Sequence, residues 1–229
     1  MFKEAIKKNT KTYNLLRKIR EVLRIFYNTK TRSRFFWNLR NGDTRLTLNY
    51  PLDKESIVID VGAYKGEFIE KLIKRHSPTI HAIEPIKEFS SYLQRKFVND
   101  SNIIVHSFGL FDETKKVKIS NLGAGSSIFA RKEGSAEQII SLKSMSKFVE
   151  EESIQEIDLL YMNIEGSEYQ LLNHIIETGL IQNVKHLQVQ FHNYILNSKL
   201  ERKKIRKKLR KTHNCVFNFP FIWERWDRI

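Results

Sequence analysis

Residues 56–66, with the sequence SIVIDVGAYKG, form a β-branched run that contains Asp60 and continues into two glycines. Such a run is typical of a strand buried in a parallel sheet. Gly62 and Gly66 allow the backbone to pass close to a ligand, and the helix predicted at 67–75 presents its free N–H groups there. The spacing is GxxxG after an acidic residue, whereas a dinucleotide pyrophosphate favours GxGxxG, so NAD is the weaker interpretation.

The alternation of strand and helix continues on the C-terminal side of this stretch. Further strands are predicted at residues 79–84, 102–108, 157–164 and 184–191, with helices at 89–97, 143–152, 168–178 and 199–211. Elements that alternate in this way form a parallel sheet with right-handed crossovers. The sequence therefore predicts a doubly wound α/β domain that ends in a pair of strands near residues 214–226.

One segment, residues 112–142, interrupts this alternation. It contains short β-like pieces around Gly123–Ser127, where the sequence reads GAGSS. Glycine-rich and serine-rich stretches between β-like pieces are turn signals. We therefore predict that an inserted β-hairpin occupies this segment.

The part of the chain before the domain has a different pattern. In residues 3–28, apolar side chains recur at spacings of three and four with basic side chains between them, which predicts a basic amphipathic helix. Residues 29–50 are predicted to be irregular, with a turn signal at Asn41–Asp43. We therefore divide the chain into a basic helical extension, 1–50, and a domain, 51–229.

Positive charge is concentrated at the two ends of the chain. The formal net charge is +14; residues 1–50 hold 13 basic and 3 acidic side chains, and residues 199–229 hold 11 and 3. A basic end can meet phosphate on nucleic acid, on anionic lipid headgroups or on a nucleotide-linked substrate. The alternative is a solvated helix face. For the N-terminal helix, docking on its own domain, on a membrane surface or on another subunit all stay open.

Composition narrows the class of protein further. Hydrophobic residues make up 41% of the chain, which is sufficient for one sizeable core. Cys215 is the single cysteine, so an intrachain disulfide and a CxxC metal site are excluded, and a reducing compartment is expected. The chain has neither an apolar run of about 18 residues nor the apolar stretch of a secretory signal. We therefore predict a cytoplasmic protein that contacts the anionic inner face of the membrane only peripherally, through its basic ends.

Two more predicted strand ends carry unusual polar residues. Glu84 closes the second strand, 22 residues after Gly62, where a carboxylate can accept hydrogen bonds from both hydroxyls of a ribose. The alternative is a surface glutamate before a proline turn. Asn163 and Glu165 close the strand predicted at 157–164, and a glutamate after such an apolar strand is costly unless it has a partner or a task. Because ligands bind beyond the carboxyl ends of the strands in open α/β sheets, we expect these residues at one site.

Four segments together carry a resemblance to a known family. They are VIDVGAYKGEF (58–68), IHAIEP (80–85), IDLLYMNIEGSEYQLL (157–172) and LQVQFHNY (187–194). Over roughly residues 46–229 the sequence resembles the FkbM-type S-adenosylmethionine-dependent methyltransferases. The resemblance implies a class I methyltransferase (Rossmann-like) fold, with a mostly parallel seven-stranded sheet and a terminal antiparallel strand. It also implies S-adenosylmethionine as cofactor and a sugar hydroxyl as methyl acceptor.

The resemblance assigns roles to individual residues. Gly62 and Gly66 would contact the methionine part of the cofactor, and Glu84 would bind the ribose. The full set of expected cofactor contacts is Asp60, Gly62, Ala63, Tyr64, Gly66, Glu84, Pro85, Phe108 and Asn163. The sequence departs from the family pattern at Tyr161 and Asn163, where Lys and Asp are common. Because Asn163 carries no charge, we expect no metal there.

Methyl transfer to a sugar hydroxyl requires a general base, because the hydroxyl is a poor nucleophile. His192, which follows the strand predicted at 184–191, and Glu165 are the two candidates. A histidine has the better-matched intrinsic pKa, about 6.5, so His192 is favoured. The alternatives are a hydrogen-bonded structural imidazole for His192 and a loop-orienting carboxylate for Glu165.

The sequence thus favours an O-methyltransferase that acts on a sugar hydroxyl in a surface-glycan or glycolipid (polysaccharide biosynthesis) pathway. The acceptor could be free, nucleotide-linked or lipid-linked. An RNA methyltransferase is the first alternative, because both ends of the chain are basic. A catalytically inactive basic binding module on the same fold is the second. Nucleic acid is the less favoured partner.

Overall fold

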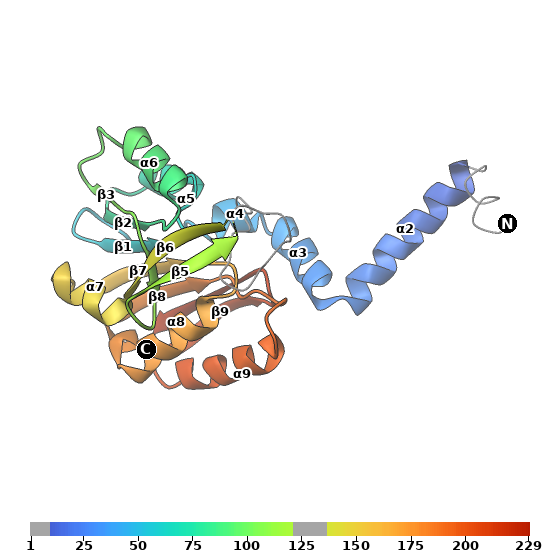
Figure 1. Ribbon diagram of the computed structural model, residues 1–229. Coiled ribbons are helices and arrows are strands. Elements are labelled where there is room, and N and C mark those ends of the chain that lie inside the picture. Colours follow the sequence, from blue (N-terminus) through green and yellow to red (C-terminus); the bar gives the residue numbers. More distant parts are fainter. Residues whose placement is uncertain (1–9, 121–136) are drawn as a thin grey trace.

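The computed structural model describes residues 10–120 and 137–229, and its centre is one sheet of seven strands (Figure 1). Across the sheet the strands follow the order β3 (Ile103–His106), β2 (Thr79–Ile83), β1 (Ile57–Val61), β7 (Ile157–Met162), β8 (Val184–Val189), β10 (Trp223–Arg228) and β9 (His213–Phe219). Strands β3, β2, β1, β7 and β8 pair in parallel, and β10 runs antiparallel to β8 and β9. This arrangement confirms the predicted sheet and its terminal antiparallel strand.

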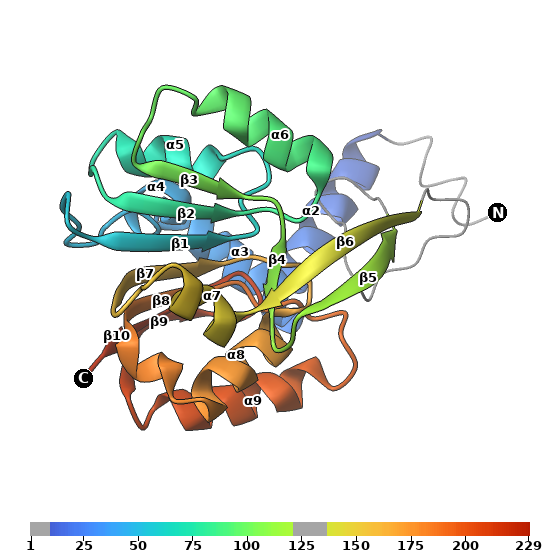
Figure 2. The same ribbon diagram turned by 60° about the vertical axis from the view of Figure 1, so that its left-hand side comes forward.

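Five helices cover the two faces of this sheet. They are α5 (Glu67–Ile73), α6 (Lys87–Lys96), α7 (Met145–Glu151), α8 (Glu168–Glu177) and α9 (Ser198–Leu209). Helices α5 and α6 lie on one face, and α7, α8 and α9 on the other (Figure 2). Val58 packs in the core beneath α5 and α6, whereas its neighbour Ile59 packs in the core beneath α7, α8 and α9. A strand buried on both faces requires apolar side chains at successive positions, which explains the run in β1.

A second, smaller sheet is inserted after β3. It consists of β4 (Gly109–Phe111), β6 (Glu137–Ser144) and β5 (Lys115–Ser120), with β5 and β6 antiparallel and β4 parallel to β6. The predicted hairpin is confirmed, although Gly123–Ser127 lies outside the described residues. The strand predicted at 102–108 is shorter than expected, because the chain leaves the main sheet after His106 and enters the small sheet at Gly109.

The N-terminal region differs from the prediction. It forms α2 (Thr10–Tyr27), α3 (Thr29–Leu39) and α4 (Gly42–Arg45), so the expectation that residues 29–50 are irregular is wrong. The cause is Trp37, which is fully buried against Phe219 and Trp223 and donates a hydrogen bond from Nε1 to Asp43 Oδ1 (2.9 Å). Helices are recognised in a sequence by apolar residues that recur at spacings of three and four. A single buried tryptophan produces no such repeat, so the pattern of residues 29–50 did not indicate these helices.

Helices α3 and α4 therefore pack on the domain, whereas α2 projects away from it (Figure 1). Among the described residues, no helix has the length and apolar character needed to cross a bilayer. The division at residue 50 into two folding units stays a prediction.

The basic helix near the C-terminus, α9, packs on the main sheet and exposes part of its surface. Ile205 and Leu209 of α9 are fully buried in the main core. On another side of the helix, Arg202 and Arg206 form ion pairs with Glu224, which is buried on β10. Part of the positive charge of this end is therefore neutralised inside the protein.

Candidate functional site

Two cavities open near the C-terminal ends of the central strands, where ligands bind in open α/β sheets. One, the apolar cavity, has a volume of about 250 Å³ and extends to the small sheet. The other, the polar cavity, has a volume of about 400 Å³ and extends toward α3 and α5. Gly62, Tyr64 and Asn163 line both cavities. The two cavities thus meet where β1 and β7 end.

Gly62 allows the turn after β1 to approach the end of β7. Its φ is +92°, and a Cβ atom at this position would lie 2.3 Å from the backbone oxygen of Asn163. Gly66 begins α5 with φ +75°, and a Cβ there would collide with the side chains of Leu93 and Phe97. Both glycines are required by backbone geometry and close packing, so the turn is fixed before any ligand binds.

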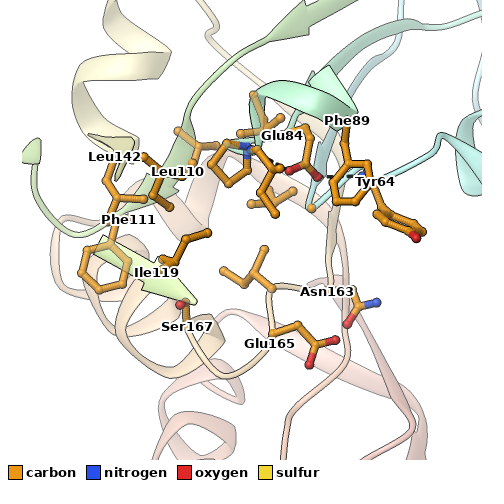
Figure 3. A pocket seen from close by; sticks show the side chains of 18 residues that line it. Tyr64, Glu84, Phe89, Leu110, Phe111, Ile119, Leu142, Asn163, Glu165 and Ser167 are labelled. Atoms are coloured by element: carbon orange, nitrogen blue, oxygen red, sulfur yellow. Dashed lines mark hydrogen bonds between the residues drawn. The ribbon is translucent and has the colours of Figure 1, made fainter. Parts of the chain in front are cut away.

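Glu84 links the end of β2 to this turn. Its carboxylate accepts hydrogen bonds from the backbone N–H groups of Tyr64 (2.9 Å) and Ile86 (2.8 Å). Figure 3 shows Glu84 and Tyr64 on one side of the apolar cavity, opposite Asn163 and Glu165. Burial raises the pKa of Glu84 to about 7. Each carboxylate oxygen can accept a further hydrogen bond, so the position fits a ligand that offers two hydroxyls.

Asp60 and Asn163 carry buried oxygens that lack a donor. Asp60 Oδ2 and Asn163 Oδ1 accept no hydrogen bond from any residue that the structure describes, and both residues line the polar cavity. Burial, together with the nearby Glu84, raises the pKa of Asp60 to about 8. An unsatisfied buried acceptor costs roughly 1–3 kcal/mol, so these two oxygens are suited to a ligand that brings an N–H donor or a positive charge.

The wall opposite Glu84, to which Asn163 also belongs, is formed by the loop after β7 and by His192, which lies three residues after the end of β8. His192 Nε2 lies 3.4 Å from Glu165 Oε1, and His192 Nδ1 lies 2.8 Å from Glu168 Oε1. Glu168, the first residue of α8, is fully buried and also accepts hydrogen bonds from the N–H groups of Ile164 and Gly166 (both 2.9 Å). Glu168 therefore holds both the loop and the imidazole in place.

Glu165 and His192 form an ion pair at neutral pH, because the carboxyl group is ionised and the imidazole is protonated. Burial lowers the pKa of His192, but the hydrogen bonds to Glu165 and Glu168 outweigh it and raise this pKa to about 9. For Glu165, burial acts in the opposite direction, and the contact with His192 brings the pKa below its ordinary value. The Tyr194 hydroxyl also donates a hydrogen bond to Glu165 (2.8 Å). Glu165 lines the apolar cavity, whereas the His192 side chain is buried behind it.

Residues 60–219 match the Methyltransferase FkbM domain, which is more than half of the chain. The chain belongs to the FkbM methyltransferase family. No curated protein matches the sequence.

Solved structures support the fold of this FkbM chain. The crystal structure of a methyltransferase FkbM from Methylobacillus flagellatus superposes with a TM-score of 0.53 and 15% identity, covering 95% of this chain and 60% of that one. The chain thus spans about 60% of the length of that relative. A putative rRNA methylase from Clostridium thermocellum gives a TM-score of 0.52 at 9% identity, covering 83% and 95% of the two chains. At these identities the likeness shows the Rossmann-like methyltransferase fold alone.

The FkbM chain brings most of the predicted site residues together. The predicted cofactor contacts that line a cavity are Asp60, Gly62, Ala63, Tyr64, Glu84, Pro85 and Asn163. Gly66 lines neither cavity; its role is to allow the turn between β1 and α5. Phe108 also lines neither: its ring lies 5.3 Å from His106 and 6.0 Å from Phe148, while the following residues, Gly109 and Leu110, line the apolar cavity.

Two positions depart from the common pattern of the FkbM family. Tyr161, where lysine is common, stacks on Phe68 (centroid distance 3.7 Å) and contacts Trp223 (4.7 Å), and all three line the polar cavity. Asn163, where aspartate is common, supplies one of the two donor-less oxygens described above. An aromatic wall thus occupies the place of a cation.

Sequence reasoning missed Glu168 and the residues that α3 contributes to the site. Glu168 belongs to the segment EGSE and differs from an ordinary first-turn helix glutamate through its burial, its bonds to the preceding loop and its contact with His192. Arg34 of α3 lines the polar cavity. Arg34 reaches this cavity because the buried Trp37 holds α3 on the domain, and the sequence pattern did not indicate that Trp37 is buried.

A histidine pair lies outside both cavities. His81 Nδ1 and His106 Nε2 are 3.0 Å apart, and Glu152 lies 3.9 Å from His81. Burial lowers the pKa of His81 to about 4, so the imidazole is neutral. The two rings also contact Phe148 of α7 edge-on. We assign this group to the packing of β2 and β3 against α7.

Proposed function

We propose that the chain is an S-adenosylmethionine-dependent O-methyltransferase that methylates a sugar hydroxyl in a surface-glycan or glycolipid pathway. One observation carries the proposal: carboxyl groups that lack a cation lie on one side of the meeting point of the two cavities, and the Glu165–His192 pair lies on the other side. The first side suits a cationic, ribose-bearing cofactor, and the second suits a hydroxyl that must lose its proton.

On the cofactor side, the residues present fit S-adenosylmethionine. Glu84 would hold the ribose hydroxyls, and the donor-less oxygens of Asp60 and Asn163 would hold the ammonium group. Pro85 and Leu110, which line the apolar cavity, would contact the adenine. When bound, the cofactor supplies a methyl group already activated for transfer, so the main task of the protein is alignment.

On the acceptor side, we propose that Glu165 accepts the hydroxyl proton and that His192 acts as its positioning residue. This reverses the order favoured by sequence alone. The reason is geometric. Glu165 lines the apolar cavity, whereas the side chain of His192 is buried and both of its ring nitrogens face carboxylates. An imidazole with a pKa of about 9 is protonated at neutral pH and donates rather than accepts.

The acceptor and its location complete the proposal. The aromatic wall of Phe68, Tyr161 and Trp223 offers flat apolar faces to the ring of a sugar, and Arg34 and Gln190 offer hydrogen bonds in the same cavity. We propose that the reaction takes place in the cytoplasm, with peripheral contact to the anionic membrane through the basic ends. The acceptor is a free, nucleotide-linked or lipid-linked sugar.

Calorimetric titration with S-adenosylhomocysteine is the first test. Binding supports the methyltransferase assignment, and its absence would leave the inactive-module alternative. Methyl transfer to sugars and to RNA, followed by mass spectrometry, then separates the two enzyme alternatives. Mass spectrometry of surface glycans from cells with and without the gene identifies the methylated sugar.

A further inference from the structure

Helix α2 exposes an apolar stripe that the described part of the chain leaves uncovered. The stripe consists of side chains at spacings of three and four, with exposed fractions between 45% and 68%: Leu15, Leu16, Ile19, Val22, Leu23 and Phe26. An amphipathic helix of a globular protein normally buries such a stripe. A continuous exposed apolar surface of this kind indicates a site of interaction.

The charge of α2 indicates the chemistry of its partner. The helix contains five basic residues and one acidic residue, and Arg17, Lys18 and Arg20 are exposed beside the stripe. Two copies of α2 packed together would bring two sets of positive charge into contact. A surface with negative charge above an apolar interior satisfies both faces of the helix.

The other basic helix, α9, lacks this combination. Two of its three apolar residues, Ile205 and Leu209, are buried, Leu200 is exposed on its own, and Arg202 and Arg206 form ion pairs with Glu224. A high basic content alone therefore does not create a docking face in this protein. Of these two basic helices, α2 is the one whose described residues combine positive charge with a continuous exposed apolar stripe.

Helix α3 connects this face to the proposed acceptor site. It begins two residues after α2 ends, and its Lys30 and Arg34 line a cavity of about 380 Å³ together with Asn193. Arg34 also lines the polar cavity, and Lys30 is one of the charges that lower the pKa of Glu165. Positive charge thus continues from α2 to the entrance of the site.

We propose that α2 is a membrane-docking helix, which lies on an anionic bilayer with its apolar stripe among the acyl chains. Docking in this way holds the acceptor side of the site near the bilayer surface. The acceptor is then a lipid-linked sugar, with Lys30 and Arg34 near its phosphate; this last step rests on the proposed function, whereas the docking does not.

Vesicle flotation of the full chain tests the docking. We expect binding at low salt to vesicles that are about one third phosphatidylglycerol, release at high salt, and weak binding to phosphatidylcholine alone. Ile19→Glu, which alters the stripe at an exposed position, is expected to lower partition about tenfold or more. Lys18→Glu together with Arg20→Glu is expected to lower it at least roughly 25-fold, at about fivefold for each positive charge lost and more for the negative charges added.

Matched controls use exposed positions outside α2. Val98→Glu introduces the same charge at an exposed apolar residue after α6, and Lys203→Glu with Lys207→Glu gives the same change of net charge on α9. Both controls are expected to lower partition far less than the matched α2 variants. Circular dichroism checks that all variants fold.

Several outcomes would overturn the docking. They are equal partition onto neutral vesicles, no partition onto anionic ones, or unchanged partition of both α2 variants. If α2 bound RNA and not vesicles, its partner would be nucleic acid. If α2 formed a dimer in solution without binding vesicles, its partner would be a second copy of the chain. Titration with S-adenosylhomocysteine is independent of α2, so failure of the proposed function is recognised separately.

Discussion

The two walls of the site differ in how their buried carboxyl groups are compensated. On the β1–β2 wall, Asp60 and Glu84 lie close enough for the charge of one to raise the pKa of the other, and neither has a cationic partner among the described residues. On the β7–β8 wall, Glu165 and Glu168 enclose His192. Burial raises the pKa of both Asp60 and Glu84, and the charge of Glu84 adds to the rise at Asp60, whereas on the β7–β8 wall the ion pair overrides the effect of burial.

This difference shows which wall is complete without a ligand. A buried carboxylate without a cation is costly, so the β1–β2 wall remains partly protonated until a positive ligand arrives. The β7–β8 wall already contains its counter-ion, because His192 lies between Glu165 and Glu168. Under the proposed function one wall serves binding and the other the reaction, and variants on the two walls should then separate affinity from turnover.

The largest effect is expected on the β7–β8 wall. Glu165→Gln should lower turnover by about 10²–10⁴-fold, because it removes the proposed proton acceptor. His192→Ala should lower turnover by a similar factor, since it removes the group that positions Glu165. The dissociation constant for S-adenosylhomocysteine, measured by calorimetry, should change little in both variants. Turnover of both variants within a few-fold of wild type would contradict the assignment of this wall to the reaction.

The pH profile separates the two residues of that wall. If Glu165 accepts the proton, kcat is level at neutral pH, because the pKa of this carboxyl is below its ordinary value. If His192 were the base, kcat would rise with pH up to about 9, the pKa of that imidazole. If kcat rises with pH in the wild type and this rise disappears in His192→Gln, the general base is His192 and not Glu165.

The next effect is expected on the β1–β2 wall and on binding. Glu84→Ala and Asp60→Asn should each weaken the binding of S-adenosylmethionine by about 10–150-fold, because charge-assisted hydrogen bonds contribute roughly 1.5–3 kcal/mol. Asp158→Asn is the control, since Asp158 bonds to the N–H of Ile57 at the opposite end of β1. An unchanged dissociation constant in Glu84→Ala would reject the ribose assignment.

The sequence predicted the first of these walls better than the second. Gly62 and Glu84 follow β-branched runs, and topology alone brings strand ends together, so their proximity was predictable. Glu168 was not, because its burial depends on how one loop folds back over α8. Phe108 shows the same limit: the chain leaves the main sheet two residues earlier, and the ring contacts Phe148 in place of a ligand.

Proton release on binding gives a smaller but more specific signal. Below about pH 7 both Asp60 and Glu84 are largely protonated, and a cationic ligand favours their ionised forms. Cofactor affinity should therefore rise with pH through the range of about 7–8, by at most about tenfold per pH unit for each proton released. Calorimetry in two buffers of different ionisation enthalpy measures the release directly. Asp60→Asn should reduce it, and equal release in wild type and variant would contradict the shared role of these carboxyls.

The smallest effect concerns the stability of the protein without cofactor, and it has opposite signs on the two walls. The folded-state pKa of Asp60 is raised above the ordinary 3.8, so its contribution to stability is present at low pH and is lost as pH rises toward 8. Asp60→Asn should therefore raise the stability near pH 8 by roughly 1–2 kcal/mol, or about 3–6 °C in Tm, with no gain near pH 4. The pKa of Glu165 is lowered, so Glu165→Gln should reduce stability near neutral pH and have little effect in acid. Tm values across this pH range, measured by differential scanning calorimetry, test both signs, and a loss of stability near pH 8 in Asp60→Asn would mean that the cavity already satisfies this carboxyl without a ligand.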